Sequence, residues 1–269
     1  MANSIPQFGF GTWKRDGEEG YRCVREALDI GYRHIDTAEG YNNEEFVGKA
    51  IAESGLPRKD VFITTKVAPA HFGPGQVLPH VKVSLQKLRV DRVDLLLLHW
   101  PSIKDEYDVN DYVAQLAEVQ ELGFATHIGV SNFTKKYLDA AFRVLGKRPI
   151  ATNQVECHVL MQNRIIVDYT KSKGIAITAY CPLARGLLST HEGIKKIATA
   201  HGATPEQIGL AFLLAEGHVV IPSSSKKERI QSCWDAQKIK LSEAEMMAIR
   251  KMDENRRLLN EGWGPVWDT

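Results

Sequence analysis

Short apolar segments alternate with amphipathic helical segments along the whole chain. In the helical segments 17–31, 43–55 and 79–90, apolar residues recur at intervals of three and four, as on one face of an α-helix. Glycine, which readily adopts the left-handed conformation of many helix ends, closes several of the helical segments, at Gly31, Gly55, Gly146 and Gly174. The apolar segments between them predict eight strands, at 7–12, 33–36, 61–66, 94–99, 127–131, 152–156, 176–180 and 219–223.

Eight strands that are each followed by helix predict an α/β fold, the closed (β/α)8 TIM barrel. A doubly wound parallel sheet is the rival interpretation, but regular units without a change in composition favour closure. No linker rich in Pro, Gly or Ser divides the chain, so we expect residues 1–269 to form a single domain. A C-terminal tail begins at about Asp253 and carries Trp263 and Trp267, which are costly to leave in water. We therefore expect the tail to pack against the barrel.

The charge balance excludes partners that are recruited by bulk charge. Thirty-four basic residues nearly cancel 33 acidic ones, so we expect no nucleic acid and no membrane surface as a partner. The longest strongly apolar stretch, at 93–98, is far too short to span a bilayer. Four scattered cysteines contain no C-x-x-C pair, which argues against disulfides and structural zinc and favours a cytoplasmic location.

Polar residues gather where the predicted strands end, and in a (β/α)8 barrel those ends form the open mouth. Asp36, Lys66 and His99 each follow apolar residues, so each head group needs a partner. Asp36 and Lys66 end neighbouring strands and can pair directly. Tyr41 lies five residues after Asp36, in the loop that covers the mouth.

These four residues suggest acid–base chemistry. An ammonium beside a phenol lowers the phenol pKa from about 10 toward neutrality, so that Tyr41 can give a proton. Asp36 would hold Lys66 charged, and His99 would bond the substrate oxygen. Three alternatives stay open: an ion pair that only closes the mouth, a Schiff-base aldolase that uses Lys66, and a barrel that binds a cofactor without catalysis.

A metal site is not expected from the sequence. Glu156, Cys157 and His158 are potential ligands, but consecutive strand residues cannot all face one ion, and no H-x3-H helix supports them.

Ordered motifs over nearly the whole chain resemble those of the aldo-keto reductase family. The matching segments are HIDTAEGYNNEEFVGKAI at 34–51, ITTKV at 63–67, LLLHWP at 96–101, IGVSNF at 128–133, NQVECH at 153–158 and IPSSSKKERI at 221–230. Within that family the short N-terminus and the IPSS pattern are similar to the bacterial B-type 2,5-diketo-D-gluconate reductase group. The family binds its dinucleotide without a Rossmann fold, and the single G-x-G here opens no helix.

The resemblance implies a role for each matching residue. Asp36, Tyr41, Lys66 and His99 would form a catalytic tetrad with Tyr41 as the general acid, and the tail would border the barrel mouth. The substrate pocket would be lined by Trp13 and Trp100 together with His99. The implied cofactor is NADPH, held by Gly11, Thr12, Ser131, Asn132, Gln154, Tyr180, Leu183, Ser223, Ser224, Ser225 and Arg229.

Two positions depart from the family pattern near the adenine end of the cofactor. Ser223 stands where many relatives carry lysine, and Cys233 where many carry asparagine. Arg229 and neighbouring hydroxyls can still clamp a 2′-phosphate, so NADPH remains the expected cofactor. The expected partner is a small-molecule carbonyl, either a keto-sugar acid such as 2,5-diketo-D-gluconate or a small dicarbonyl such as methylglyoxal, reduced by a monomeric enzyme.

Overall fold

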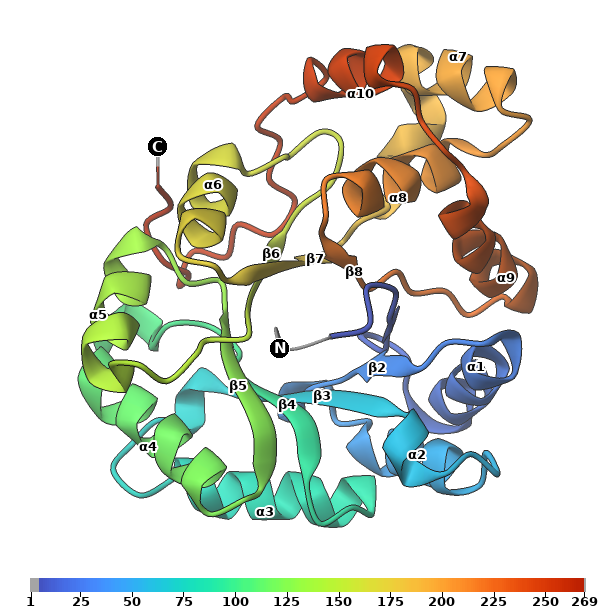
Figure 1. The fold of residues 1–269 in the computed structure, drawn as a ribbon. Coiled ribbons are helices and arrows are strands. Elements are labelled where there is room, and N and C mark those ends of the chain that lie inside the picture. The colour runs from blue at the N-terminus through green and yellow to red at the C-terminus, as the bar shows by residue number, and fades with distance from the viewer. Residues whose placement is uncertain (1–4, 269) are drawn as a thin grey trace.

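The computed structural model describes residues 5–268, and its centre is an eight-stranded parallel β-sheet curled into a barrel (Figure 1). Each strand pairs in parallel with the next one along the chain, which requires a crossover connection between every pair. The predicted (β/α)8 fold is confirmed. The strands are β1 (Phe10–Gly11), β2 (His34–Asp36), β3 (Phe62–Val67), β4 (Val93–Leu98), β5 (Ala125–Ser131), β6 (Thr152–Glu156), β7 (Ala176–Tyr180) and β8 (Val219–Val220).

Backbone hydrogen bonds between the first and last strand segments close the barrel. The Gly9 N–H donates to the Val220 carbonyl at 2.8 Å, and the Gly11 N–H donates to the Pro222 carbonyl at 3.0 Å. Regular pairing is shorter here than the sequence predicts, because Pro222 has no N–H with which to continue the ladder. A Cβ on Gly11 would lie 2.8 Å from the Ile221 carbonyl oxygen, so the close approach of the two segments requires glycine.

Helices surround the sheet on its outer side (Figure 1). The predicted helix 43–55 ends early, at Ala52, and Gly55 with φ of 78° lies in the following loop. Gly31 and Gly146 do cap their helices with positive φ, as expected. The α-helices are α1 (Gly17–Ile30), α2 (Glu44–Ala52), α3 (Val77–Leu88), α4 (Val109–Glu121), α5 (Lys135–Leu145), α6 (Arg164–Ser172), α7 (Glu192–Ala200), α8 (Pro205–Ala215), α9 (Lys227–Asp235) and α10 (Glu243–Arg250).

Among residues 5–268, six short 3-10 helices lie in the connections, and four of them contribute residues to the site. The 3-10 helices are η1 (Glu39–Tyr41), η2 (Arg58–Asp60), η3 (Pro69–His71), η4 (Ile103–Asp105), η5 (Ala184–Thr190) and η6 (Ala236–Lys238). η1 follows β2 and η3 follows β3, so both lie at the carboxyl ends of their strands. That end of the barrel is where this fold places its functional loops.

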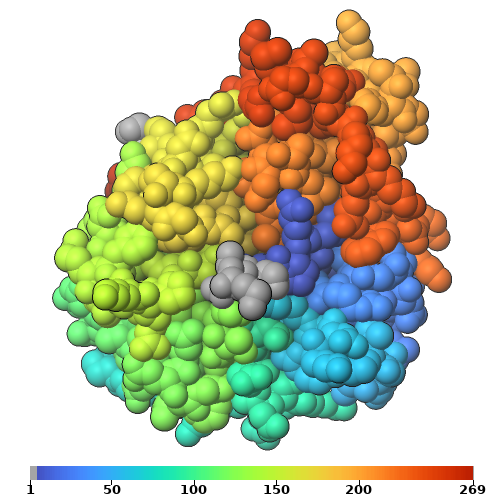
Figure 2. All heavy atoms as spheres, viewed as in Figure 1, coloured from blue at the N-terminus to red at the C-terminus, as the bar shows by residue number. Residues whose placement is uncertain are grey.

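Alternate side chains of the strands belong to different apolar clusters. On β4, Leu96 and Leu98 pack in the large cluster that includes the helices, whereas Leu95 and Leu97 point into the barrel. Ile5 joins the inner cluster and closes the barrel at the amino ends of the strands. Figure 2 views this face, and the first described residues, in dark blue, lie near its centre. Among residues 5–268, no helix has the length and apolar character to cross a membrane.

The C-terminal tail packs against the barrel, as predicted. The backbone N–H groups of Leu258 and Leu259 donate to the two carboxylate oxygens of Glu156, at 2.7 and 2.9 Å. Farther along, the ring of Trp263 lies 5.1 Å from that of Trp100 in an edge-to-face contact. The tail therefore covers the side of the barrel at which β6 and β4 end.

Candidate active site

A cavity of about 1020 Å³ opens at the carboxyl ends of the strands. Lys66 of the expected tetrad lies beneath its wall and is fully buried, and Ser225 of the expected cofactor residues is also not part of the wall. The other expected site residues all line the cavity: Gly11, Thr12, Trp13, Asp36, Tyr41, His99, Trp100, Ser131, Asn132, Gln154, Tyr180, Leu183, Ser223, Ser224 and Arg229.

Lys66 is the charged centre of the site. Its Nζ donates to Asp36 Oδ1 at 2.6 Å, to the Thr37 carbonyl at 2.7 Å and to the Tyr41 hydroxyl at 3.3 Å. The second oxygen of Asp36 accepts a hydrogen bond of 2.8 Å from Gln154 Nε2. Three contacts account for all three ammonium protons, so the ion pair is buried without an unpartnered donor.

The pKa values of Lys66 and Tyr41 differ in part from those expected from the sequence. Burial lowers the pKa of Lys66, but Asp36 and then Tyr41 more than offset this, so the pKa lies above its ordinary value. Burial raises the pKa of Tyr41, and the nearby Lys66 ammonium only reduces that rise. The expectation of a phenol pKa lowered toward neutrality was therefore wrong for this cavity, because loss of water around the phenolate outweighs the cation.

His99 packs against Tyr41 in the wall of the cavity. Their rings meet edge to face with centroids 5.4 Å apart. Burial and then the Lys66 charge hold the His99 pKa well below its ordinary value. At neutral pH the imidazole is therefore uncharged, and it can form a hydrogen bond to a substrate oxygen in the cavity.

Hydrogen bonds fix the polar residues at the ends of β5, β6 and β7. The Tyr180 hydroxyl donates to Asn132 Oδ1 at 2.8 Å, and Asn132 Nδ2 donates to the His99 carbonyl at 3.1 Å. Asn132 adopts a left-handed φ of 61°, a conformation that asparagine tolerates better than most residues. The bond from Gln154 to Asp36 was not foreseen, because sequence reasoning assigned Gln154 to the cofactor alone.

The loop after β8 lies at the other end of the cavity. Ser223 Oγ is buried and has no hydrogen-bond partner among residues 5–268. Ser224 Oγ accepts the Lys226 N–H at 3.1 Å, and the Ser225 carbonyl accepts a bond of 2.9 Å from Arg22 on α1. Ser225 thus contacts α1 through its backbone, outside the cavity wall.

Several wall residues were missed by sequence reasoning. Lys14 and Arg15 line the cavity from the loop after β1, and Arg185 from η5, where its guanidinium stacks over Trp13 at 5.4 Å. Trp263 also lines it, from the tail that was expected to border the barrel mouth. All of them belong to βα loops or the tail, and strand and helix periodicity does not report which loop side chains turn toward the cavity.

Glu156 and His158 meet in the structure but serve the fold. His158 Nε2 lies 2.9 Å from Glu156 Oε1, and both side chains are fully buried. The same carboxylate accepts the two N–H groups of the tail. This arrangement anchors the tail to the end of β6.

A buried ammonium, a phenol and an uncharged imidazole around one cavity form a site that can protonate a substrate oxygen at the mouth of a (β/α)8 barrel. The sequence of residues 7–254 matches the model of the aldo/keto reductase family. The chain belongs to this family, and it is an oxidoreductase that acts on carbonyl groups with a nicotinamide cofactor.

Relatives and solved structures agree with this assignment. Methylglyoxal reductase DkgB of Escherichia coli O157:H7 is 44% identical over 266 residues, which cover 98% of this chain and all of that protein. The 9,11-endoperoxide prostaglandin H2 reductase of Trypanosoma cruzi is 39% identical over 96% of this chain and 92% of that protein. A crystal structure provisionally named as a 2,5-diketo-D-gluconic acid reductase B superposes with a TM-score of 0.94 at 36% identity, covering 99% of this chain and 95% of that one.

Proposed function

We propose that the chain reduces small dicarbonyl compounds such as methylglyoxal, using NADPH and Tyr41 as the general acid. The proposal rests on the contact of the Tyr41 hydroxyl with Lys66, at 3.3 Å, beside a cavity that Tyr41 and His99 line. NADPH supplies hydride to the carbonyl carbon, and the carbonyl oxygen then needs one proton. Tyr41 gives this proton, and Lys66 stabilises the phenolate that remains.

The wall residues fit a polyanionic cofactor of this kind. Ser223 offers a buried hydroxyl that has no partner in the described part of the chain, and an unsatisfied buried donor is costly unless a ligand completes it. Arg229 lines the same part of the cavity, and a guanidinium suits paired hydrogen bonds to phosphate. We assign the 2′-phosphate to these two residues together with Ser224. Asn132 and Gln154 are the candidates for the carboxamide, and Tyr180 for the face of the nicotinamide ring.

The aldolase alternative is not favoured, because Lys66 is unsuited to attack a carbonyl. Its Nζ is fully buried with three hydrogen-bond acceptors around it, and Asp36 helps to hold its pKa above the ordinary value. A Schiff base needs a neutral amine that reaches the substrate. Binding of a cofactor without turnover remains the competing function, and an assay of turnover decides between it and carbonyl reduction.

The choice of a small dicarbonyl rests on the relatives and on the wall around Tyr41. DkgB proteins named as methylglyoxal reductases align over almost the whole chain. Trp13, Trp100 and Trp263 line the cavity and make part of its wall apolar. A keto-sugar acid is the second candidate, because Arg185 on that wall offers a cation for a carboxylate.

Steady-state oxidation of NADPH, followed by absorbance, tests the proposal. Methylglyoxal, 2,5-diketo-D-gluconate and an aromatic aldehyde are compared by kcat/KM. We expect methylglyoxal to give the highest value. A higher kcat/KM for the sugar acid would move the assignment to that substrate, and binding of NADPH without turnover of any carbonyl would contradict the reductase.

We expect Tyr41→Phe to lower kcat by about 10²–10⁴-fold, the usual contribution of general acid catalysis. The ring is retained, so the cavity and the affinity for NADPH should change little. Fluorescence titration of NADPH is the control for an intact cofactor site. Turnover of methylglyoxal at the parent rate by Tyr41→Phe would exclude Tyr41 as the acid.

We also propose that the enzyme is a cytoplasmic monomer. All four cysteines are free thiols, which suits a reducing compartment. Light scattering of the purified protein, which reports its mass in solution, tests the monomer.

A further inference from the structure

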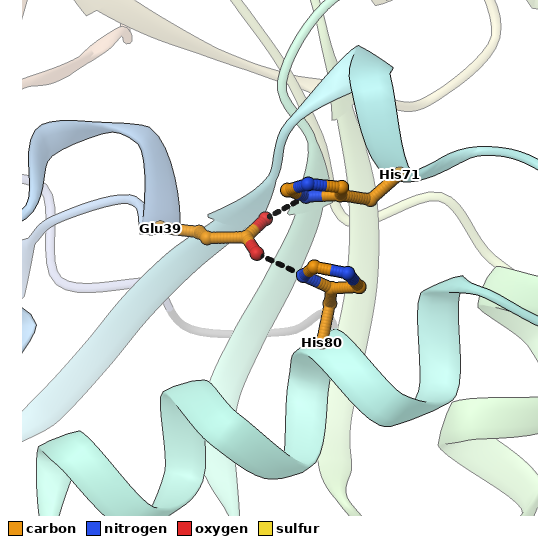
Figure 3. A group of neighbouring side chains, drawn as sticks. All are labelled: Glu39, His71 and His80. Atoms are coloured by element: carbon orange, nitrogen blue, oxygen red, sulfur yellow. Dashed lines mark hydrogen bonds and ion pairs between the residues drawn. The ribbon is translucent and has the colours of Figure 1, made fainter.

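Two histidines and one glutamate converge outside the lining of the cavity (Figure 3). Glu39 belongs to η1, His71 to η3 and His80 to α3, so three separate elements contribute one side chain each. Their nearest ligand atoms all lie within 4.8 Å of one another. We propose that this cluster binds one divalent transition-metal ion such as Zn²⁺.

The donor atoms already point toward one another. His71 Nδ1 lies 3.0 Å from Glu39 Oε2, and His80 Nδ1 contacts the other carboxylate oxygen (Figure 3). Zn²⁺ bonds of about 2.0–2.1 Å at tetrahedral angles hold ligand atoms about 3.3 Å apart, close to the spacing of the pair at 3.0 Å. Imidazole nitrogen and carboxylate oxygen together suit zinc and its neighbours better than Ca²⁺ or Mg²⁺, which prefer oxygen alone.

The two imidazole rings are stacked, with centroids 3.4 Å apart and planes 13° from parallel. Stacking brings both Nδ1 atoms to the same edge of the pair, which faces Glu39 (Figure 3). Each ring must tilt slightly so that its lone pair meets the ion. That rotation costs little energy, because the terminal side-chain torsion of histidine has a broad energy minimum.

The surroundings favour an open, three-ligand site. Glu39 is oriented by the Ala68 N–H, which donates to Oε2 at 3.1 Å, an outer hydrogen bond of the kind that fixes ligating carboxylates. The Glu39 side chain is 11% exposed, whereas His71 and His80 are 34% and 28% exposed. Water can therefore reach the ion and complete its coordination.

The site would act as a cross-link beside the active site. η1 carries Tyr41 two residues after Glu39, and Ala68 and Pro69, just before His71, line the cavity. A bound ion would fasten the loop of the proposed acid and one wall of the cavity to α3. This inference does not depend on the identity of the substrate or the cofactor.

Calorimetric titration of ZnCl2 into the full chain tests the site, with protein that was treated with chelator and carries no polyhistidine tag. We expect one ion per chain with micromolar or tighter affinity. CoCl2 should give visible absorption bands from nitrogen and oxygen ligands. At a zinc concentration about a hundred times Kd, the melting temperature should rise by about 5 °C or more.

Variants assign the binding to this cluster. His71→Gln, His80→Gln and Glu39→Gln should each weaken zinc binding by at least about 100-fold, since even the outer partners of metal ligands contribute about 10–100-fold. His201→Gln is the matched control, because His201 also pairs with one glutamate, Glu245, at 2.8 Å and is 24% exposed. Its affinity should equal that of the parent. No binding by the parent chain, or equal affinity in the parent and all three cluster variants, would overturn the proposal.

Discussion

Lys66 shows how one buried charge organises the site. Lys66 forms an ion pair with Asp36 and donates its other hydrogen bonds to the Thr37 carbonyl and the Tyr41 hydroxyl. Gln154 donates to the second oxygen of Asp36. Removing one member of a buried pair leaves the other charge uncompensated, at a cost of about 3–5 kcal/mol. A loss of activity in Lys66→Met can therefore reflect a loss of stability, and its melting temperature must be measured as well. Tyr41→Phe removes no charge and avoids this problem.

The raised pKa of Tyr41 predicts the pH dependence of reduction. A general acid must carry its proton, and a pKa above the ordinary tyrosine value of about 10 keeps the phenol protonated throughout the neutral and mildly alkaline range. We expect kcat/KM for reduction, measured at saturating NADPH, to show no alkaline decrease below about pH 10. A decrease centred near pH 8 that disappears in Tyr41→Phe would show that the Lys66 charge prevails over burial in the working enzyme.

Arg229 and Ser223 predict the choice between NADPH and NADH. Hydrogen bonds to charged groups contribute roughly 1.5–3 kcal/mol each, so Arg229→Ala should weaken NADPH binding by about ten- to a hundredfold. NADH lacks the 2′-phosphate and should bind almost as before, while Ser223→Lys should sharpen the preference for NADPH. Fluorescence quenching gives both dissociation constants. Equal losses for the two cofactors would mean that Arg229 contacts the adenine and does not bind the phosphate.

At the scale of the elements, the strand ends were predictable and the tail path was not. Asp36, Lys66 and His99 follow apolar runs, so their place at the barrel mouth follows from the strand pattern alone. The truncated pairing of β1 and β8 depends on Pro222 and on a close approach at Gly11, which periodicity does not report.

The anchoring of the tail on Glu156 joins residues about 100 positions apart in the chain. Composition can predict that a tail with two tryptophans packs somewhere, but the partner depends on the folded surface. The same holds for Gln154, whose bond to Asp36 spans the barrel between β6 and β2.

The two anchoring regions of the tail predict separable effects of truncation. Ending the chain after Asn260 keeps the bonds of Leu258 and Leu259 to Glu156. It removes the contacts of Trp263 and Trp267 with Trp100 and the bond of Asp268 to Lys135. We expect KM for methylglyoxal to rise and the ranking of substrates to change, with little loss in melting temperature. Ending the chain after Asp253 should add a loss of stability, because Glu156 then loses both N–H donors.

Steady-state kinetics and thermal unfolding of both truncated chains check this. A fall in melting temperature for the shorter deletion, with an unchanged ranking of substrates, would show that the tail only stabilises the fold.

At the scale of the whole molecule, buried histidines link folding to pH. His218 precedes β8, is 3% exposed, and burial followed by the Lys171 charge lowers its pKa to about 3. The unfolded chain takes up this proton below about pH 6.5, while the folded chain does so only near pH 3. Stability is therefore lost as pH falls through that window.

We expect the parent to lose about 2–3 kcal/mol more than His218→Gln in its free energy of unfolding between pH 7 and pH 4.5, since each pKa unit corresponds to about 1.4 kcal/mol. Urea unfolding at the two pH values measures this. The other histidines are common to both proteins and cancel in the difference. Parallel losses in the two proteins would show that His218 takes up its proton without unfolding.

The end of the tail has a consequence for how the protein is handled. Asp268 Oδ2 accepts the Lys135 N–H at 3.0 Å at the first turn of α5, where the preceding Thr134 makes no side-chain cap. Trp267 lies one residue earlier, 6.0 Å from Trp100 of the cavity wall. A fusion partner joined to the carboxyl end would disturb this capping contact and the cavity wall beside it. The amino-terminal segment instead meets the barrel at Ile5, on the opposite face. Affinity tags and fluorescent reporters for kinetic work therefore belong at the amino end.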